Sequence, residues 1–275
     1  MTSKTKTLLL TFFTSALAIS WWVCIVWMFV IAFKPATASV THISSWFTPP
    51  FTLDNFQFVL NNPQADVGRW LMNSVIVSVV TTAVTLVLAT LAAFAFSRIR
   101  FPLKGFWFWL IVASLMLPTE ATLIPLFILM RDLGLLNTYA SLILPVVPSA
   151  FALIVLKQFI DALPAELFDA ANIDGAGWLR VFIAIVIPLC KPAVAAVGIF
   201  VFLGSWNNFT WPFISITDPS IMTLPVGLPF FNSQFTASMG YTMAANAIAA
   251  FPVLIVFFML QKYIIRGITF SGMKL

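Results

Sequence analysis

The chain has 275 residues, of which 61% are hydrophobic and only 8% charged, and its formal net charge is +5. A soluble domain carries about 25% charged residues, so this composition excludes a soluble globular protein. The basic residues lie in short stretches beside apolar runs. Their charge is therefore better explained by orientation in a membrane than by nucleic-acid binding.

Six apolar runs follow one another, each long enough to cross a hydrocarbon core of about 30 Å. Lipid offers backbone groups no hydrogen-bonding partners, so each run is expected to be helical. The first run, Leu8–Phe33, exceeds the apolar core of a signal peptide and is expected to be retained. The sequence predicts an all-α polytopic membrane protein with a single transmembrane domain over 1–275. The predicted spans are about 8–33, 71–97, 106–130, 139–160, 186–208 and 242–265.

The basic residues predict the direction of the spans. If the N-terminus is cytoplasmic, 11 of the 14 Lys and Arg residues fall on the cytoplasmic side and 3 on the other. The positive-inside rule favours this orientation, with both termini in the cytoplasm. The 11 are Lys4, Lys6, Arg98, Arg100, Lys104, Lys157, Arg180, Lys191, Lys262, Arg266 and Lys274; the 3 are Lys34, Arg69 and Arg131.

The stretch 161–182, on the predicted cytoplasmic side, has the pattern of a short helix between two spans. Pro164 suits a first helical turn, and the acids Glu166 and Asp169 are favoured near a helix N-terminus. Gly175 can end the helix in a left-handed conformation. Such a helix is either an interfacial linker or a surface that a partner approaches closely, and the pattern alone favours neither.

A few polar residues within or at the ends of the spans are candidates for a substrate path. Glu120 is an acid inside an apolar run, and such residues usually face a cavity, although a carboxyl paired with a neighbouring helix is an equal alternative. Asn73, Asn207 and Asn208 have amides that could bind a polyol, yet amides between membrane helices are often structural. His42 has no converging ligands and is interpreted as a surface histidine, so no metal site is expected.

The 161–182 stretch also resembles a known motif. Asp169-Ala170-Ala171, Asp174-Gly175-Ala176 and the following Phe182, Ile187-Pro188-Leu189 and Pro192 are similar to the EAA loop of ABC importer permeases. Asp169 stands where the family has Glu, and Ile187 stands where it usually has Leu.

The resemblance extends over nearly the whole chain, to carbohydrate-uptake permeases of the MalG type. Further matching segments are Phe33-Lys34, Phe51-Thr52-Leu53-Asp54-Asn55-Phe56, Asn73-Ser74, Pro118, Ile124-Pro125-Leu126, Gly134-Leu135, Asn137-Thr138, Leu144-Pro145, Trp206-Asn207, Thr223-Leu224-Pro225-Val226-Gly227, Gln261-Lys262-Tyr263 and Arg266-Gly267.

The resemblance implies a type I ABC importer permease in the bacterial inner membrane. Its EAA helix would dock on a cytoplasmic ATPase subunit through Glu166, Asp169, Ala170, Ala171, Asp174, Gly175 and Ala176. The implied partners are a second, non-identical permease, an ATPase dimer, an external solute-binding protein and a sugar-like substrate. ATP and Mg would be bound by the ATPase subunits, since this chain has no G-x-x-x-x-G-K-[ST] phosphate loop and no cofactor of its own is expected.

Two other functions are weighed against this one. An ion-coupled secondary carrier would have broken helices and more buried charges, and would act without ATPase subunits. A membrane enzyme would cluster His, Asp or Glu at a membrane border, which one His and nine acids spread along the chain do not support. The residues do not select among maltose, other oligosaccharides, glycerol-phosphate-like compounds and glucosyl-polyols.

Overall fold

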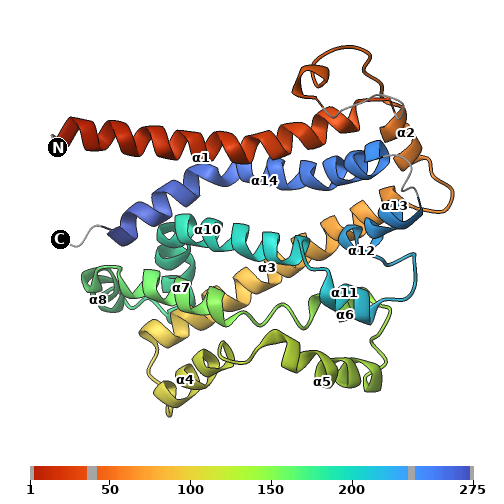
Figure 1. The fold of residues 1–275 in the computed structure, drawn as a ribbon. Helices are drawn as coiled ribbons and strands as arrows, with labels where there is room; N and C mark the ends of the chain where they lie inside the picture. Colours follow the sequence, from red (N-terminus) through yellow and green to blue (C-terminus); the bar gives the residue numbers. More distant parts are fainter. Residues whose placement is uncertain (1–2, 36–41, 235–238, 273–275) are drawn as a thin grey trace. The chain divides into compact units, whose positions relative to one another are not determined.

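The computed structural model describes residues 3–35, 42–234 and 239–272, and every regular element in these ranges is helical (Figure 1). Lys274 and the segments 36–41 and 235–238 lie outside them. The chain forms two compact units. The first contains Met1–Gly68 and Gly227–Pro252, and the second contains Arg69–Val226 and Val253–Leu275.

Four helical segments are long and apolar enough to cross a membrane in the described part of the chain. They are Thr7–Ala32 of α1 (Ser3–Ala32), α3 (Val67–Arg98), Trp178–Trp206 and Met239–Met259 of α14 (Met239–Gly272). The segment Trp178–Trp206 joins α9 (Trp178–Val181), a π-helical turn (Phe182–Val186) and α10 (Ile187–Trp206). These four match the predicted first, second, fifth and sixth spans.

The other two predicted spans are not continuous helices. The run 106–130 folds as α4 (Lys104–Ser114) and α5 (Thr119–Asp132), which are bent by 101°. Pro118 directly precedes α5 with an extended ψ of 133°. A proline lacks the N–H that would continue the preceding helix and disfavours helical geometry at the residue before it. The expectation of one uninterrupted helix here is therefore wrong.

The run 139–160 is broken in the same way. It contains the short α6 (Tyr139–Ile143) and α7 (Ala150–Asp161), and Pro145 and Pro148 lie between them. Ser149 begins α7 by accepting a hydrogen bond from the Ala152 N–H at 3.2 Å, as a helix N-cap does. A single helix was the wrong expectation here too. That each broken segment crosses the bilayer as a whole stays a prediction.

The first unit is held at one end by the buried side chain of Asn55 in α2 (Asp54–Leu60). Its amide donates to the backbone oxygens of Ala32, at 2.9 Å, and Lys34, at 2.7 Å, which joins α2 to the end of α1. The start of α14 lies against the same amide, because a Cβ added at Gly240 would come within 2.7 Å of Asn55 Nδ2. One amide therefore joins α2 to the end of α1 and lies close to the start of α14.

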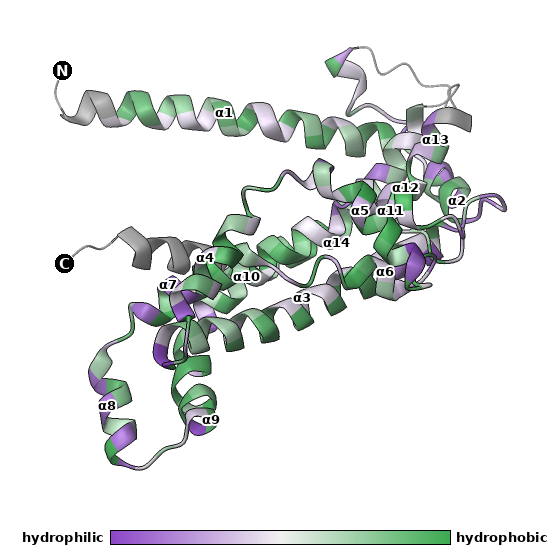
Figure 2. Cartoon of the chain, turned by 90° about the horizontal axis from the view of Figure 1, so that it is seen from below, coloured by the Kyte–Doolittle hydropathy of each residue, from purple (hydrophilic) through white to green (hydrophobic). Residues whose placement is uncertain are grey.

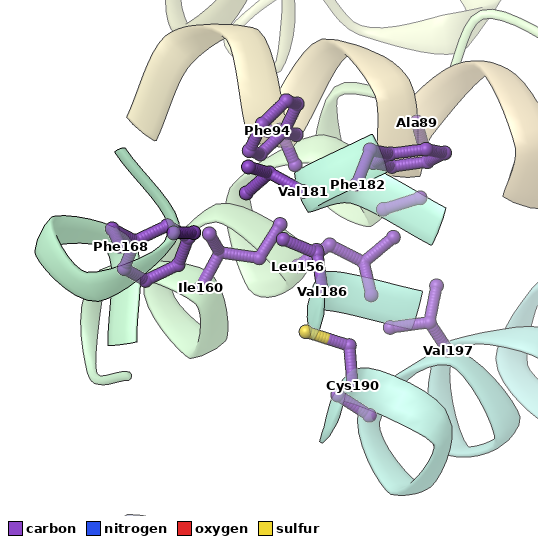
Figure 3. Packing of buried hydrophobic residues seen from close by; sticks show 14 residues of the cluster. Ala89, Phe94, Leu156, Ile160, Phe168, Val181, Phe182, Val186, Cys190 and Val197 are labelled. Atoms are coloured by element: carbon purple, nitrogen blue, oxygen red, sulfur yellow. The ribbon is translucent and has the colours of Figure 1, made fainter. Parts of the chain in front are cut away.

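The second unit has its core where α3, α7, α8 (Ala165–Ile173), α9 and α10 meet (Figure 3). Hydrophobic residues cover most of α3 and α10, whereas α8 alternates hydrophilic and hydrophobic residues (Figure 2). The short elements α11 (Thr210–Ser215), α12 (Leu224–Gly227) and α13 (Pro229–Gln234) lie between α10 and α14 in the chain. Because α8 lies at the edge of this core, some of its side chains are buried and others are exposed.

Candidate functional site

The predicted short helix is present as α8, with Pro164 directly before it and Glu166 in its first turn. Its end is a Schellman motif. Gly175 has a φ of 70°, its N–H donates to the Asn172 oxygen at 3.1 Å, and the Ala176 N–H donates to the Ala171 oxygen at 2.9 Å. The expectation that Gly175 ends the helix in a left-handed conformation is confirmed.

The inner face of α8 is part of the core of the second unit. Phe168 and Ala171 are buried there, and Phe168 lies beside Ile160 of α7 (Figure 3). Ala176, beyond the helix end, packs against the same cluster. Two of the predicted docking residues, Ala171 and Ala176, therefore hold α8 in place and do not form its free surface.

Arg98, at the end of α3, pins this face of α8. Its guanidinium donates to the Ile160 and Leu163 oxygens at 2.9 and 3.0 Å and lies 3.9 Å from the ring centre of Phe168. A guanidinium donates several hydrogen bonds in a fixed plane and also stacks on aromatic rings. The sequence analysis counted Arg98 only as an orientation charge. No local pattern could reveal its role, because its bonding partners are 62 and 65 positions away.

The outer face of α8 is free in this chain. Glu166, Asp169, Ala170, Asp174 and Gly175 are all exposed. Apolar side chains share the surface, since Ile173 is 87% exposed and Leu167 is 40% exposed. An isolated exposed apolar residue is ordinary, but here two exposed apolar side chains and three exposed acids share one short helix and its C-terminal end.

The segment after α8 connects it to a long apolar helix. Trp178 and Phe182 contact Phe94 of α3, with ring centroids 6.2 and 5.4 Å apart. From Trp178 the chain is helical to Trp206, through the π-helical turn at Phe182–Val186. Single π-turns inside helices often occur at functional sites. The segment after α8 thus joins it through residues 174–177 to the helical stretch that includes α10.

The four predicted substrate-path residues lie in different settings. Glu120 is exposed in the first turn of α5, directly after the bend. Asn207 is exposed at the end of α10, where its amide donates to the Leu203 oxygen at 2.9 Å. Asn208 is half-buried, and its oxygen accepts a hydrogen bond from the Trp211 N–H at 3.4 Å.

Asn73 differs from the other three, because it is 2% exposed and bonded at both ends of its amide. Its Nδ2 donates to the Ser220 and Met222 oxygens at 3.0 and 2.8 Å, and its Oδ1 accepts the Tyr139 hydroxyl at 2.6 Å. Of the two roles that the sequence left open, this geometry favours the structural one.

The segment that Asn73 holds, 215–224, is bound at two further points. Asn137, with a left-handed φ of 58°, accepts the N–H groups of Thr217 and Asp218 at 2.6 and 3.0 Å. Ser74 accepts the Leu224 N–H at 2.8 Å. Hydrogen bonds from the Ser220 backbone N–H and side chain hold the pKa of the Asp218 carboxyl below its ordinary value. Three of the matching segments in the sequence thus meet here: Asn73-Ser74, Asn137-Thr138 and Thr223-Leu224.

The two broken runs differ in how their surroundings bind them. The α6–α7 break is bound by neighbouring helices: Thr85 of α3 donates to the Val147 oxygen at 3.1 Å, and the Trp211 indole donates to the Ser141 oxygen at 2.8 Å. At the α4–α5 break, Met116 and Leu117 are 84% and 62% exposed and Glu120 is exposed beside them. Irregular backbone at membrane depth is tolerated where it contacts protein or lines a water-filled cavity.

A metal site would need several His, Cys, Asp or Glu side chains that converge on one point. Within residues 3–35, 42–234 and 239–272, no group of three His, Cys, Asp or Glu side chains is placed to hold a metal ion. His42 is exposed.

Comparisons with known proteins agree on the family. Residues 85–270 match the family described as binding-protein-dependent transport system inner membrane component. The arabinooligosaccharides transport system permease protein AraQ of Halalkalibacterium halodurans is 34% identical over 249 residues, covering 90% of this chain and 89% of that protein.

Two solved structures share the fold. A bacterial ABC transporter involved in the import of the acidic polysaccharide alginate matches with a TM-score of 0.80 and 22% identity, covering 96% of this chain and 99% of that one. A bacterial alginate ABC transporter in complex with a pentasaccharide-bound periplasmic protein matches with a TM-score of 0.60 and 14% identity, covering 94% and 93%. The resemblance carried by the EAA-like motif is confirmed, and the chain belongs to the family of inner-membrane permease components of binding-protein-dependent ABC transport systems.

Proposed function

We propose that this chain is one of two non-identical membrane-spanning subunits of an ATP-driven importer of oligosaccharides or sugar-polyols. In this proposal α8 docks on a cytoplasmic ATPase subunit, and the ATPase dimer binds ATP and Mg and supplies the energy. The 11-to-3 asymmetry of basic residues supports a cytoplasmic position for α8. Family membership and the sugar named for AraQ support the transport role and the substrate class.

The observation that carries the proposal is the two-sided character of α8. Its inner face is fixed to the helix bundle by the burial of Phe168 and Ala171 and by the stacking of Arg98 on Phe168, whereas its outer face leaves Glu166 and Ile173 exposed. A helix fixed on one side and free on the other transmits a displacement from a partner into the bundle. The unbroken segment Trp178–Trp206 carries that displacement along α10.

Loss of the outer apolar contact tests the docking role. In the co-expressed transporter, Ile173→Glu should abolish co-purification of the ATPase, because a charge would replace an 87% exposed apolar side chain at the interface. Leu133→Glu is the matched control, since Leu133 is 59% exposed next to another left-handed glycine, Gly134, on the predicted external side. If Ile173→Glu retains the ATPase as fully as Leu133→Glu does, α8 is not the docking element.

The α4–α5 break is proposed to border the substrate path. At this break Met116 and Leu117 are exposed, and Glu120 is exposed in the first turn of α5 that follows. A carboxylate accepts hydrogen bonds from sugar hydroxyls, and Asn207 and Asn208 add neutral donors and acceptors. An external solute-binding protein would deliver the sugar, and the stretch 209–241, which lies between the predicted fifth and sixth spans, is proposed to contact it.

An ion-coupled secondary carrier is the alternative. Carriers often have discontinuous helices near their substrate, so the α4–α5 break by itself is compatible with either function. Family membership favours ATP as the energy source. Uptake into proteoliposomes decides between the two: the importer needs the ATPase subunits and internal ATP, and the carrier would transport sugar with the ATPase left out.

A further inference from the structure

The second unit has an apolar groove between α3, α10 and α14 that the proposed transport function does not use. The cavity has a volume of about 390 Å³. Aliphatic side chains and Phe202 form most of its wall. The lining residues are Val79, Thr82, Leu86, Ile187, Lys191, Val194, Ala195, Gly198, Phe202 and Val256.

Apart from the Lys191 ammonium near one end, the groove offers a sugar no free hydrogen-bonding group. The Thr82 hydroxyl donates to the Ser78 oxygen of its own helix at 2.6 Å and is thereby engaged. The only other polar lining residue is Lys191, whose stem is aliphatic. A polyol would lose its hydrogen bonds to water on entering such a groove, so the groove is not part of the sugar path.

Lys191 gives the groove a cation near one end. Among the residues that the structure describes, its ammonium has no hydrogen bond or ion pair, and the residue is exposed. Two other lysines of this unit are engaged, since Lys157 pairs with Asp161 at 2.6 Å and Lys104 donates to the Ile99 oxygen at 3.0 Å. A long lysine side chain lays its stem along apolar surface and holds its charge where polar groups are available.

The dimensions of the groove match one leaflet of a bilayer. From Lys191 to Phe202 the lining positions on α10 extend over about 16 Å along a helix axis. Half of a hydrocarbon core is about 15 Å, so the groove can accommodate an acyl chain with its polar end at the level of Lys191. The asymmetry of basic residues places that end at the cytoplasmic leaflet, which carries anionic lipids.

We propose that this groove binds an anionic phospholipid, with its phosphate on the ammonium of Lys191 and an acyl chain along α10 between α3 and α14. The acyl chain then covers the apolar wall of the groove, and the phosphate neutralises the Lys191 ammonium. Basic pockets between membrane helices on the cytoplasmic side are known to bind acidic head groups. The lipid holds α10, the helix that follows α8, against α3.

Lipid retention by the assembled transporter tests the proposal. The purified complex is equilibrated with vesicles of equal amounts of phosphatidylglycerol and phosphatidylcholine, and bound lipids are counted by native mass spectrometry. The wild type should retain phosphatidylglycerol in preference. Lys191→Gln should lower that retention about fivefold, the effect of one lysine at a membrane surface, whereas Lys191→Arg should keep it.

Two further variants separate the charge from the cavity. Arg100→Gln removes another exposed cation from the same predicted side, outside the groove, and should leave retention at the wild-type level. Ala195→Phe fills the groove and should lower the retention of both lipids. Equal phosphatidylglycerol retention in Lys191→Gln and the wild type would overturn the proposal. So would an Ala195→Cys variant that crosslinks to the second permease while lipid retention is unchanged, because a protein helix would then occupy the groove.

Discussion

Tyr139 donates its phenolic proton to the side-chain oxygen of Asn73 over 2.6 Å, and this contact joins the start of α6 to α3. The other end of the same amide holds the backbone of Ser220 and Met222. An asparagine at the border of a predicted span of a transporter invites a substrate-binding interpretation. Here both the nitrogen and the oxygen of the amide are hydrogen-bonded within the chain.

Substitution of Asn73 should therefore affect stability before it affects sugar binding. Asn73→Asp would replace the two donated bonds with a carboxylate facing the oxygens of Ser220 and Met222. Tyr139→Phe leaves Asn73 Oδ1 without its hydroxyl donor, at a cost of about 1–3 kcal/mol for an unsatisfied buried group. Both variants should lower the melting temperature of the purified transporter, and Asn73→Asp should lower it more than Tyr139→Phe does. An altered sugar KM with unchanged thermal stability would contradict this role.

Gly175 and Gly134 form a matched pair for testing the coupling role. Both end a helix with a φ near 70° (70° and 68°), and an added Cβ at either meets nothing within 4 Å. An aspartate at each position should thus cost a similar amount, roughly 1 kcal/mol of left-handed strain. Gly175→Asp should abolish sugar uptake while the protein stays in the membrane, and Gly134→Asp should retain uptake. Equal loss in both variants would show that helix termination alone is responsible.

Arg98→Lys should weaken the mechanical link between α8 and the bundle. Lysine keeps the charge, so membrane orientation is unchanged, but it has no planar fork to reach the Ile160 and Leu163 oxygens and stack on Phe168. We expect sugar uptake to fall severalfold while ATP hydrolysis continues. Arg100→Lys, at an exposed position two residues on, should behave like the wild type. Unchanged uptake per ATP hydrolysed in Arg98→Lys would remove Arg98 from the coupling path.

Gly240→Ala should destabilise the first unit. The new methyl would lie 2.7 Å from Asn55 Nδ2 and 2.9 Å from Oδ1, and the amide cannot turn aside without losing its bonds to Ala32 and Lys34. The expected loss is about 1–3 kcal/mol, seen as a lower melting temperature. Gly105→Ala, in α4 where a Cβ meets nothing within 4 Å, serves as the control. Equal melting temperatures for the two variants would show that Asn55 adapts.

Removal of the Glu120 charge tests the substrate path. Glu120→Gln and Asn207→Ala should each lower kcat/KM for sugar uptake by about tenfold, the effect of one hydrogen bond involving a charged or well-placed group. Asp132→Asn on the same helix, where Asp132 pairs with Arg131 at 2.9 Å, should leave uptake unchanged. If both path variants transport with wild-type kinetics, the proposed path at the α4–α5 break is wrong.

Local chemistry made several elements predictable. The short helix α8 and the left-handed Gly175 followed from a proline, two early acids and a glycine within twelve positions, all of which act on their own backbone. The first, second, fifth and sixth spans were found because long apolar runs can only be helices in lipid. The breaks within 106–130 and 139–160 were not predicted, because a hydropathy pattern scores apolar length and does not register that Pro118 and Pro145 interrupt a helix.

By itself, the sequence determined that this is a helical membrane protein, which of its residues resemble an ABC permease, and where the short helix between two spans begins and ends. These properties depend on composition and on neighbours within one or two helical turns. Only the tertiary structure decided that Ala171 faces inward, that Arg98 bonds to residues more than sixty positions away and stacks on Phe168, and that the Asn73 amide is bonded to Ser220 and Met222. Each of these depends on which distant backbone oxygen or ring lies within bonding distance, and that geometry exists only once the helices have packed.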